Sequence, residues 1–294
     1  LLLDGRQHAL KILMNSFYGY LGYARSRWFS RECASAVTAW SRHYVKEVLG
    51  KAEKQGFKAL YGDTDSAFLL LPKEKNEKDV ETFVEEINKS LPGVMNLELE
   101  GFFKRGIFVT KESGEGAKKK YALIDYNNKL KIVGFEYVRR DWSGVAKETQ
   151  RQVITAVLEE GHPEKAAEIV KKTINRLRSG KAKKSELVVL TQLKKPIEKY
   201  AAIGPHVAAA KKAIEKGKEM EVGSVIAYVI TRSGKSISDR AQLEEYVKEG
   251  NYDSEYYIEN QVMPAVIKIM RELGYNKQDL IHGGKQSKLG AFLG

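Results

Sequence analysis

The stretch KALYGDTDSAFLLL, residues 58 to 71, carries the clearest structural pattern in the sequence. Two apolar runs, ALY and AFLLL, flank the polar tetrad at 62–65. Apolar runs on both sides of a short turn-forming stretch predict a β-hairpin. Asp63 and Asp65 lie two residues apart, and in an extended backbone this spacing directs both carboxylates to the same face. The sequence therefore predicts a hairpin with an acidic pair at or beside its turn.

The acidic pair has two interpretations. Asp-x-Asp in a turn is usually turn chemistry exposed to water. The flanking apolar runs instead predict buried strands, and burying two carboxylates is costly unless cations balance their charge. Two divalent ions can stabilise the attacking and leaving oxygens of a phosphoryl transfer, and Mg²⁺ favours carboxylate and phosphate oxygens. We therefore expect Asp63 and Asp65 to hold Mg²⁺.

Helical and strand-like patterns surround the hairpin. Apolar residues recur every three or four positions in 6–20 and 32–54, and a charged helix is expected at 77–90. Residues 97–138 are β-like and are interrupted by turn formers. The rest of the chain predicts helices at 143–160, 163–178, 206–217 and 253–273, with short strand-like pieces at 187–192 and 225–231. Helices interleaved with antiparallel strands predict an α+β fold.

The composition is that of a basic globular chain. Its 294 residues, 43% of them hydrophobic, suffice for two or three compact units with ordinary cores. The formal net charge of +12 favours a polyanionic partner, with nucleic acid ahead of an anionic membrane surface. No run approaches the roughly 18 apolar residues that a spanning helix needs, so no membrane role and a cytoplasmic location are expected. The only cysteine, Cys33, excludes an internal disulfide and is expected to pack as a small apolar residue.

The first predicted helix carries three polar side chains on one face. Lys11, Asn15 and Tyr18 fall at positions i, i+4 and i+7, whereas Phe17 and Tyr20 point elsewhere. A lysine can bind a triphosphate as a point charge, and an aromatic ring beside glycine can pack against a base or a sugar. A surface lysine next to core aromatics would give the same pattern, so both interpretations stay open at the level of this helix alone.

Five segments together resemble one known family. KILMNSFYGY at 11–20, followed by YGDTDS at 61–66, resembles motifs B and C of the family B DNA polymerases, in particular the archaeal replicative enzymes. Three later segments resemble the palm-to-thumb region of the same family: KKKYALID at 118–125, GFEYVRRDWSGVAKETQ at 134–150 and IGPHVAAAKK at 203–212. The resemblance thus covers nearly the whole chain.

The resemblance implies a domain organisation. It predicts a palm with an antiparallel sheet and packed helices, followed by a mainly helical thumb domain. Residues 1–22 would be the C-terminal fingers helix, residues 23–137 the palm with the motif C hairpin at 58–71, and residues 138–294 the thumb with a C-terminal tail.

The resemblance also implies roles for the acidic residues. Asp65 would be the principal ligand of two Mg²⁺ ions, with Asp63 as its neighbour in the motif. Glu100, in the segment ELEGFF, matches an acidic palm position near the metals. A structural salt bridge explains Glu100 equally well.

The nucleotide-binding residues follow from motif B. Lys11 and Asn15 would face the triphosphate of the incoming deoxynucleotide (dNTP). Tyr18 would lie near the nascent base pair, where the fit of the nucleotide is tested. Closure of the helix that carries these residues would discriminate correct from incorrect nucleotides.

The DNA-binding residues come from the three later segments. Lys119, Lys120 and Tyr121 match the element that holds the primer terminus, and a solvated basic strand edge is the alternative. Arg139 and Arg140 would grip the duplex, with a structural Arg–Asp pair as the competing interpretation. Further along, a thumb helix begins whose N-terminal amides could bind phosphate, at Gly204 and His206.

One family element finds no match in the sequence. The resemblance implies a further aspartate from a motif A segment of the form DxxSLYP, and nothing in the chain matches it. We therefore expect a partner polypeptide, or a longer chain, that carries motif A, the exonuclease and the N-terminal domain. An isolated palm would also expose apolar edges. The chain by itself is expected to be inactive.

The last residues resemble a clamp-binding peptide. In QSKLGAFLG, the residues Gln286, Leu289, Phe292 and Leu293 resemble the short peptide by which replication proteins dock on the sliding clamp. A packed carboxyl terminus is the alternative.

The expected function is DNA-templated DNA synthesis. The resemblance implies in-line attack of a primer 3′-hydroxyl on the α-phosphate of a dNTP, on primer-template DNA at the nucleoid. The rival from another class is a non-catalytic DNA-binding or clamp-tethering subunit, against which the intact acidic pair argues. An RNA-copying palm enzyme is a third possibility, disfavoured by the thumb-like segments.

Overall fold

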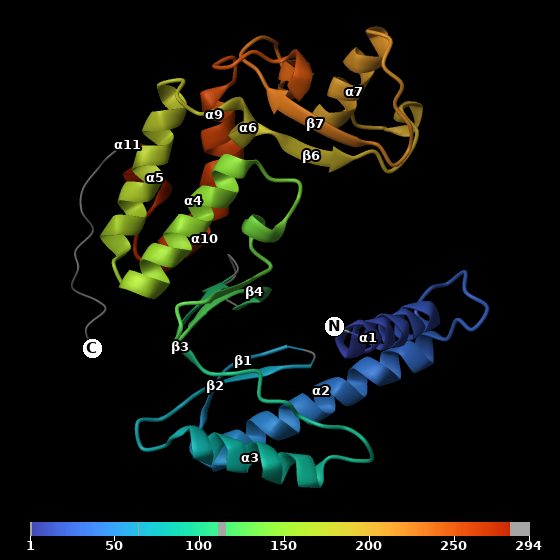
Figure 1. Cartoon of the computed structure of the whole chain (residues 1–294), viewed down its shortest axis with the longest axis vertical. Helices are drawn as coiled ribbons and strands as arrows, with labels where there is room; N and C mark the ends of the chain where they lie inside the picture. The colour runs from blue at the N-terminus through green and yellow to red at the C-terminus, as the bar shows by residue number, and fades with distance from the viewer. Residues whose placement is uncertain (1, 64, 111–115, 283–294) are drawn as a thin grey trace. The chain divides into compact units, whose positions relative to one another are not determined.

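The computed structural model describes residues 2–63, 65–110 and 116–282. The chain divides into two compact units, Leu1–Glu100 (unit 1) and Gly101–Gly294 (unit 2). Both combine helices with antiparallel strands, which confirms the predicted α+β class (Figure 1). The predicted boundaries of fingers, palm and thumb, at 22 and 137, come from a family resemblance, whereas the boundary between the two units reflects compactness. The predicted domain boundaries therefore remain predictions.

The described residues of unit 1 form three helices and one hairpin. The elements are α1 (Leu2–Leu21), α2 (Arg31–Lys54), β1 (Lys58–Gly62), β2 (Ala67–Leu70) and α3 (Glu77–Ser90). Side-chain caps define two of the helix starts. The Ser30 hydroxyl accepts a hydrogen bond from the Cys33 amide at 3.1 Å, and Asn76 forms a reciprocal capping box with Asp79 before α3. The predicted helices at 6–20, 32–54 and 77–90 are therefore confirmed.

The predicted hairpin is confirmed, with one irregularity. β1 and β2 pair antiparallel, with Ala59 opposite Leu69 and Tyr61 opposite Phe68. The register shifts between Ala59 and Tyr61, which marks a β-bulge. Helix α2 packs against both strands.

The core of unit 1 is small. Its buried side chains come from α2, α3 and the segment between α2 and β1: Val48, Ala52, Phe57, Phe83 and Ile87. Two predictions are wrong here. The strands of the hairpin are half-buried or exposed rather than buried, because they pair only with each other in a two-stranded sheet and α2 covers one face. Cys33 is exposed, since it lies in the first turn of α2 away from that core.

Unit 2 begins with a three-stranded antiparallel sheet. Its strands are β3 (Phe103–Thr110), β4 (Gly116–Asp125) and β5 (Leu130–Val133), with β4 in the centre. The predicted β-like region at 97–138 is thus too long at both ends. Gly134 has φ of +69° and ends β5, and the 3-10 helix η1 (Glu136–Val138) replaces the expected strand at FEYV.

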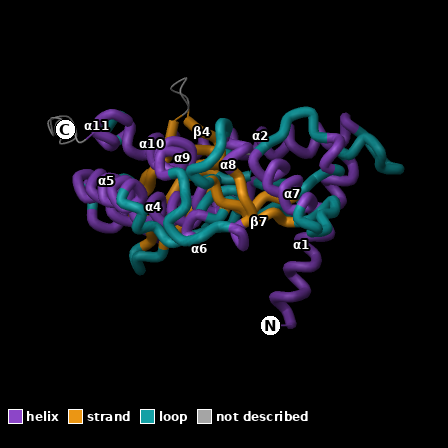
Figure 2. Tube along the Cα trace, turned by 90° about the horizontal axis from the view of Figure 1, so that it is seen from above, coloured by secondary structure: helices purple, strands orange, loops and turns teal. Residues whose placement is uncertain are grey.

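Long helices of unit 2 form a bundle that contacts this sheet. α4 (Gly144–Thr155), α5 (Pro163–Arg178) and α10 (Met263–Glu272) pack side by side (Figures 1 and 2). Single π-helical segments, η2 (Ala156–Glu160) and η5 (Ile258–Val262), extend α4 and precede α10. At the end of η2, the Arg105 guanidinium donates to the carbonyls of Leu158 and Glu159 at 3.1 and 3.3 Å. The helix predicted at 143–160 therefore ends bound to β3.

A second three-stranded sheet follows, with strand order β6–β7–β8. Its strands are β6 (Val189–Gln192), β7 (Val225–Ile230) and β8 (Ala241–Leu243), and α7 (Pro205–Glu215) packs on it. The strand-like pieces at 187–192 and 225–231 are confirmed, but β8 was not predicted. The remaining short elements of unit 2 are α6 (Lys184–Leu187), η3 (Ile197–Lys199), α8 (Ile237–Arg240), η4 (Glu244–Tyr246), α9 (Ser254–Tyr257) and α11 (Lys277–His282).

One continuous core joins the sheets and helices of unit 2. Two tyrosines buried in this core donate hydrogen bonds from their hydroxyls to backbone carbonyls. The Tyr252 hydroxyl donates to the Leu177 carbonyl, and the Tyr257 hydroxyl donates to the Leu187 carbonyl, each at 2.8 Å. Among the helices in the described ranges, none is long and apolar enough to cross a membrane.

Candidate active site and nucleic-acid interface

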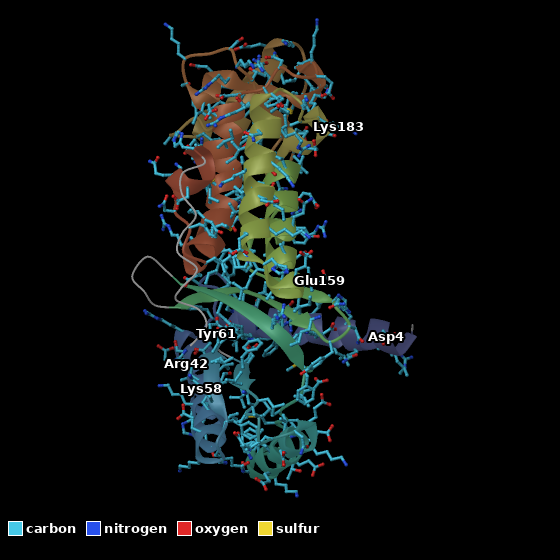
Figure 3. All side chains as sticks on the ribbon, turned by 90° about the vertical axis from the view of Figure 1, so that its left-hand side faces the viewer. Asp4, Arg42, Lys58, Tyr61, Glu159 and Lys183 are labelled. Atoms are coloured by element: carbon cyan, nitrogen blue, oxygen red, sulfur yellow. The ribbon has the colours of Figure 1, made fainter. Side chains whose placement is uncertain are left out.

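The acidic pair lies at the turn of the β1–β2 hairpin, whose first strand carries Lys58 and Tyr61 (Figure 3). The Asp63 amide donates to the Ser66 carbonyl at 2.9 Å, so backbone pairing continues beyond Gly62. Asp63 is half-buried and Asp65 is exposed. A Cβ atom at Gly62 would approach Leu49 Cδ1 to 3.2 Å, which explains why glycine precedes the pair. The hairpin thus presents two carboxylates at its tip.

The third predicted acidic residue lies in an irregular segment. Glu100 is exposed and precedes β3. Within the described ranges, no three His, Cys, Asp or Glu side chains come together as a potential metal site. The structure therefore does not bring Glu100, Asp63 and Asp65 into one cluster.

The nucleotide-binding candidates lie on α1. Lys11, Asn15 and Tyr18 are all exposed, with 43% of Tyr18 accessible. Since they are four and three residues apart on a continuous helix, they share one face. This face is open to a ligand.

An aromatic cluster at the end of α1 was missed by the sequence reasoning. The Trp28 ring lies 6.4 Å from Phe17 and 6.0 Å from Tyr20, centroid to centroid. The Tyr20 hydroxyl also accepts a hydrogen bond from the Arg27 amide at 3.2 Å. Phe17 and Tyr20 therefore fix the bend after α1. Trp28 follows the glycine-rich bend out of helical register, so periodicity gave no indication of this contact.

On β4, Lys119 and Tyr121 are the first and last residues of the predicted primer-binding segment. Lys119 is exposed and has φ of +58°, which is uncommon for a residue other than glycine. Tyr121 is half-buried and stacks on Phe108 of β3, with ring centroids 5.8 Å apart and planes inclined by 29°. Phe108 was not among the predicted site residues, although its cross-strand pairing with Tyr121 follows from the β3–β4 register.

Lys120 has a different environment from its neighbours. Its ammonium lies 2.6 and 2.8 Å from the two carboxylate oxygens of Glu136 and 5.1 Å from the Phe135 ring centroid. Gln150 Nε2 donates to Glu136 Oε2 at 2.7 Å and also to the Ala265 carbonyl. Burial lowers the pKa of Lys120, and the hydrogen bond that its ammonium donates to Glu136 opposes that shift. Sequence reasoning missed Glu136 and Gln150.

Arg139 and Arg140 are both exposed at the start of the segment before α4. Arg139 forms a bidentate pair with Asp141, with Nε–Oδ1 and Nη2–Oδ2 distances of 3.0 and 2.7 Å. Arg139 holds the pKa of Asp141 below its usual value. The structural Arg–Asp pair considered from the sequence is therefore present, and it stays accessible to solvent.

Gly204 and His206 lie at the start of α7. Gly204 is the N-cap residue, and a Cβ atom there would contact the His206 ring at 3.3 Å. The His206 ring packs edge-on against Tyr200, with centroids 5.7 Å apart. Burial lowers the pKa of His206, so its imidazole is neutral at neutral pH. The predicted clamp-binding residues, Gln286, Leu289, Phe292 and Leu293, lie outside the described residues.

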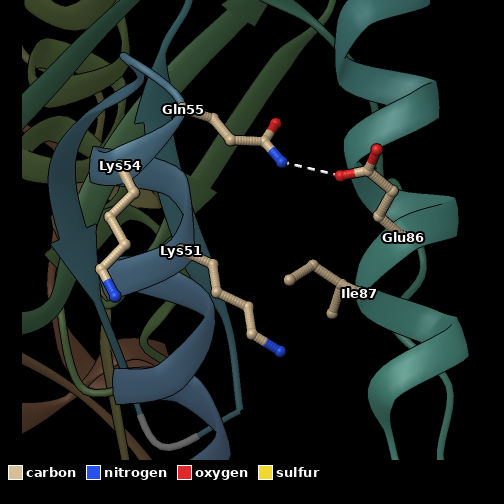
Figure 4. A pocket seen from close by; sticks show the side chains of 5 residues that line it. All are labelled: Lys51, Lys54, Gln55, Glu86 and Ile87. Atoms are coloured by element: carbon tan, nitrogen blue, oxygen red, sulfur yellow. Dashed lines mark hydrogen bonds between the residues drawn. The ribbon is translucent and has the colours of Figure 1, made fainter.

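A hollow of about 280 Å³ lies between α2 and α3 (Figure 4). Lys51, Lys54, Gln55, Glu86 and Ile87 line it. Gln55 Nε2 donates to Glu86 Oε2 at 2.7 Å, and Lys51 Nζ donates to Ser90 Oγ at 2.8 Å. These polar groups bind one another across the two helices, which indicates a structural role for the hollow.

The chain matches known polymerases along almost its whole length. DNA polymerase 1 of Pyrococcus abyssi is 49% identical over 298 residues, which cover 99% of this chain and 38% of that protein. The DNA polymerase of Thermococcus gorgonarius is 46% identical over 299 residues, again covering 99% of this chain and 38% of that protein. The chain therefore spans less than two-fifths of the length of these relatives.

A solved structure and a family profile agree with these relatives. The family B DNA polymerase of the hyperthermophilic archaeon Pyrobaculum calidifontis superposes with a TM-score of 0.66 at 32% identity, covering 94% of this chain and 35% of that chain. The profile of DNA polymerase family B matches residues 1–273. The chain therefore belongs to DNA polymerase family B.

Proposed function

We propose that this chain supplies palm and thumb residues of a DNA-directed DNA polymerase, which extends a primer with deoxynucleotides. The observation that carries the proposal is the tip of the β1–β2 hairpin. There, Asp63 and Asp65 stand at a turn in a chain that matches the polymerase family over residues 1–273. Asp65 would be the principal metal ligand and Asp63 its neighbour.

The two carboxylates fit a magnesium site that substrate completes. Mg²⁺ in phosphoryl-transfer enzymes is held through one or two carboxylates together with phosphate oxygens and water. An exposed Asp65 beside a half-buried Asp63 provides that number of protein ligands. Bound Mg²⁺ would neutralise charge on the phosphate oxygens of the transition state. We infer that a motif A carboxylate from outside this chain completes the site, whereas Glu100 is a weaker candidate because it is not clustered with the pair.

Exposed side chains on α1 would bind the nucleotide. Lys11 and Asn15 would bind the triphosphate of the dNTP, and Tyr18 would contact the nascent base pair, since all three share the exposed face of α1. This arrangement holds the nucleotide while the primer 3′-hydroxyl attacks the α-phosphate and pyrophosphate leaves.

Residues of unit 2 would hold the DNA. Lys119 and Tyr121 would contact the primer strand, and Arg139 and Arg140 would bind duplex phosphates. The N-terminal turn of α7 would provide further contacts, from Gly204 and His206. A neutral His206 would act as a hydrogen-bond donor rather than as a cation.

Primer extension tests the proposal. The chain would be assayed with Mg²⁺ and four dNTPs, alone and mixed with a polypeptide that carries motif A. We expect extension only in the mixture, because two carboxylates alone leave the site incomplete. Asp65→Asn should reduce the rate at least about a hundredfold, as loss of a group that stabilises transition-state charge does.

A matched variant and a binding assay complete the experiment. Glu85→Gln removes one carboxylate from the exposed surface of α3 and should leave the rate unchanged. Extension that survives Asp65→Asn would refute the metal assignment. A mixture that binds primer-template DNA without extending it would favour the rival function, a non-catalytic DNA-binding or clamp-tethering subunit.

A further inference from the structure

Lys120 points away from the side chains that surround it in sequence. Alternation along β4 places Lys120 on the same face as Ala122 and Ile124, both of which are completely buried in the core of unit 2. Tyr121 lies on the opposite face, where it stacks on Phe108. Only 11% of the Lys120 side chain is accessible to solvent. The central lysine of the segment therefore faces the protein.

The Lys120 ammonium is held by a neighbouring carboxylate. Both oxygens of Glu136 accept from it, and Gln150 Nε2 donates to the same carboxylate. Gln150 is fully buried, and its Oε1 accepts from the Tyr137 amide at 2.7 Å. A phosphate would have to displace Glu136, which would then be left as a buried, unpaired charge. Because the pair carries no net charge, it gives little attraction for DNA.

The backbone beside this ion pair is equally constrained. A Cβ atom at Gly134 would lie 1.7 Å from the Lys119 carbonyl oxygen, so the two segments are in direct backbone contact. The ion pair closes next to this contact and links β4 to η1, α4 and α10 through Glu136, Gln150 and the Ala265 carbonyl. A shift of Lys119 along the strand would also move Lys120 and would break its ion pair with Glu136.

We propose that Lys120 is a positioning residue that does not contact DNA, and that its ion pair with Glu136, held by Gln150, fixes the backbone from which Lys119 and Tyr121 reach the primer strand. This inference rests on the proposed function, because it assumes that Lys119 and Tyr121 bind DNA. Of the three adjacent side chains, Lys119 and Tyr121 would then bind DNA, and Lys120 would anchor the backbone of the strand.

The salt dependence of DNA binding distinguishes an anchor from a phosphate contact. The affinity of the full chain for a primer-template duplex would be measured at several salt concentrations by fluorescence anisotropy. Each phosphate contact contributes about 0.9 to the slope of log K against log salt. Lys119→Met should lower the slope by about that amount. The double variant Lys120→Met/Glu136→Leu replaces the ion pair by apolar groups, so it should leave the slope unchanged and the dissociation constant within about twofold.

Lysine acylation, read by mass spectrometry, provides a second test that does not need the double variant to fold. In the free chain, Lys120 should react roughly tenfold or more slowly than Lys119, since hydrogen bonds to a charged group must first open. The duplex should protect Lys119 and leave the Lys120 rate unchanged. Glu136→Gln should raise the Lys120 rate toward that of Lys119. Glu245→Gln, which breaks the exposed Lys218–Glu245 pair, is the matched control and should not change the Lys120 rate.

The outcomes separate the inference from the proposed function. A fall of about 0.9 in the slope of the double variant, or protection of Lys120 by the duplex, would overturn the positioning role while DNA binding stands. Equal acylation of Lys119 and Lys120 in the free chain would also overturn it. If the wild-type chain neither binds the duplex nor protects any lysine, the DNA-binding proposal itself fails, and the positioning role fails with it.

Discussion

The two compact units of the chain differ in how far their large apolar side chains are buried. In unit 2, large side chains such as Tyr257, Phe135 and Leu177 are completely buried in one core. In unit 1, comparable side chains lie on the surface of α1 and α2, where 62% of Leu13 and 58% of Trp40 are exposed. Unit 2 therefore derives its stability from its own core, whereas the exposed apolar faces of unit 1 favour a role as contact surfaces.

The difference also explains where the proposed chemistry lies. The acidic hairpin and the proposed nucleotide-binding face belong to the loosely packed unit 1. The segment from Lys119 to Tyr121 belongs to unit 2 and is anchored in its core by an ion pair. Binding the duplex calls for a rigid platform, while the reaction site needs access for substrate and for a completing segment.

The largest effect is expected from Gly134→Ala in unit 2. The new Cβ atom would collide with the Lys119 carbonyl, and the φ of +69° is unfavourable for alanine, so the free energy of unfolding should fall by at least about 4 kcal/mol. Gly93→Ala in unit 1 is the matched variant, since Gly93 has φ of +59° with nothing within 4 Å of the added atom. It should cost about 1 kcal/mol. Urea denaturation measures both values, and equal losses would show that unit 1 is as tightly packed as unit 2.

A buried ion pair and an exposed one provide the next comparison. Glu136→Gln leaves Lys120 with an unbalanced buried charge and should lower the free energy of unfolding by about 3–5 kcal/mol. Glu47→Gln on α2 breaks the solvent-exposed pair with Lys51 and should have no measurable effect. Chemical denaturation of each variant against the wild type tests this. A small effect of Glu136→Gln would mean that the buried pair is freely hydrated in solution.

Leucine truncation tests the cores directly. Leu177→Ala in α5 should cost about 2–5 kcal/mol, because it leaves a cavity in a fully packed site. Leu13→Ala in α1 should change the stability by less than about 0.5 kcal/mol, because that side chain is largely exposed. A substantial loss from Leu13→Ala would contradict the comparison, since it would show that the surface of α1 is covered in solution.

The smallest effect is a pH dependence of unit 2. Burial raises the pKa of Tyr228 to about 12, compared with about 10 for an exposed phenol. The unfolded chain therefore loses this proton first, and the stability present below pH 10 should be lost as the pH rises toward about 12, by up to roughly 3 kcal/mol. Tyr228→Phe should reduce that loss. An unchanged pH profile in the variant would show that other phenols account for it.

Local sequence patterns were sufficient for most of the elements. The helices at 32–54 and 77–90 carry regular apolar spacing with polar caps, and the helix at 163–178 carries such spacing with a proline at its start. These patterns act within a few residues. The hairpin was recognisable for the same reason. β8 has only three residues, and its pairing with β7 comes from distant contacts, so no local pattern could indicate it.

Burial and side-chain direction were harder to predict than the elements themselves. The apolar runs around Asp63 indicated buried strands, but burial depends on what covers them, and the two-stranded sheet leaves Leu60 49% exposed. Lys120 was grouped with its neighbours because all three match a basic motif. The strand alternation through Ala122 and Ile124 contained the information that it faces the core, while its partner Glu136 lies beyond a turn that sequence spacing does not resolve.

The exposed thiol of Cys33 has a practical consequence. Because it is the only cysteine of the chain and lies in the first turn of α2, a maleimide dye can be attached there without any substitution. The dye would sit on unit 1, the unit whose apolar faces are open. Its emission would then report, in real time, when a second polypeptide covers that helix.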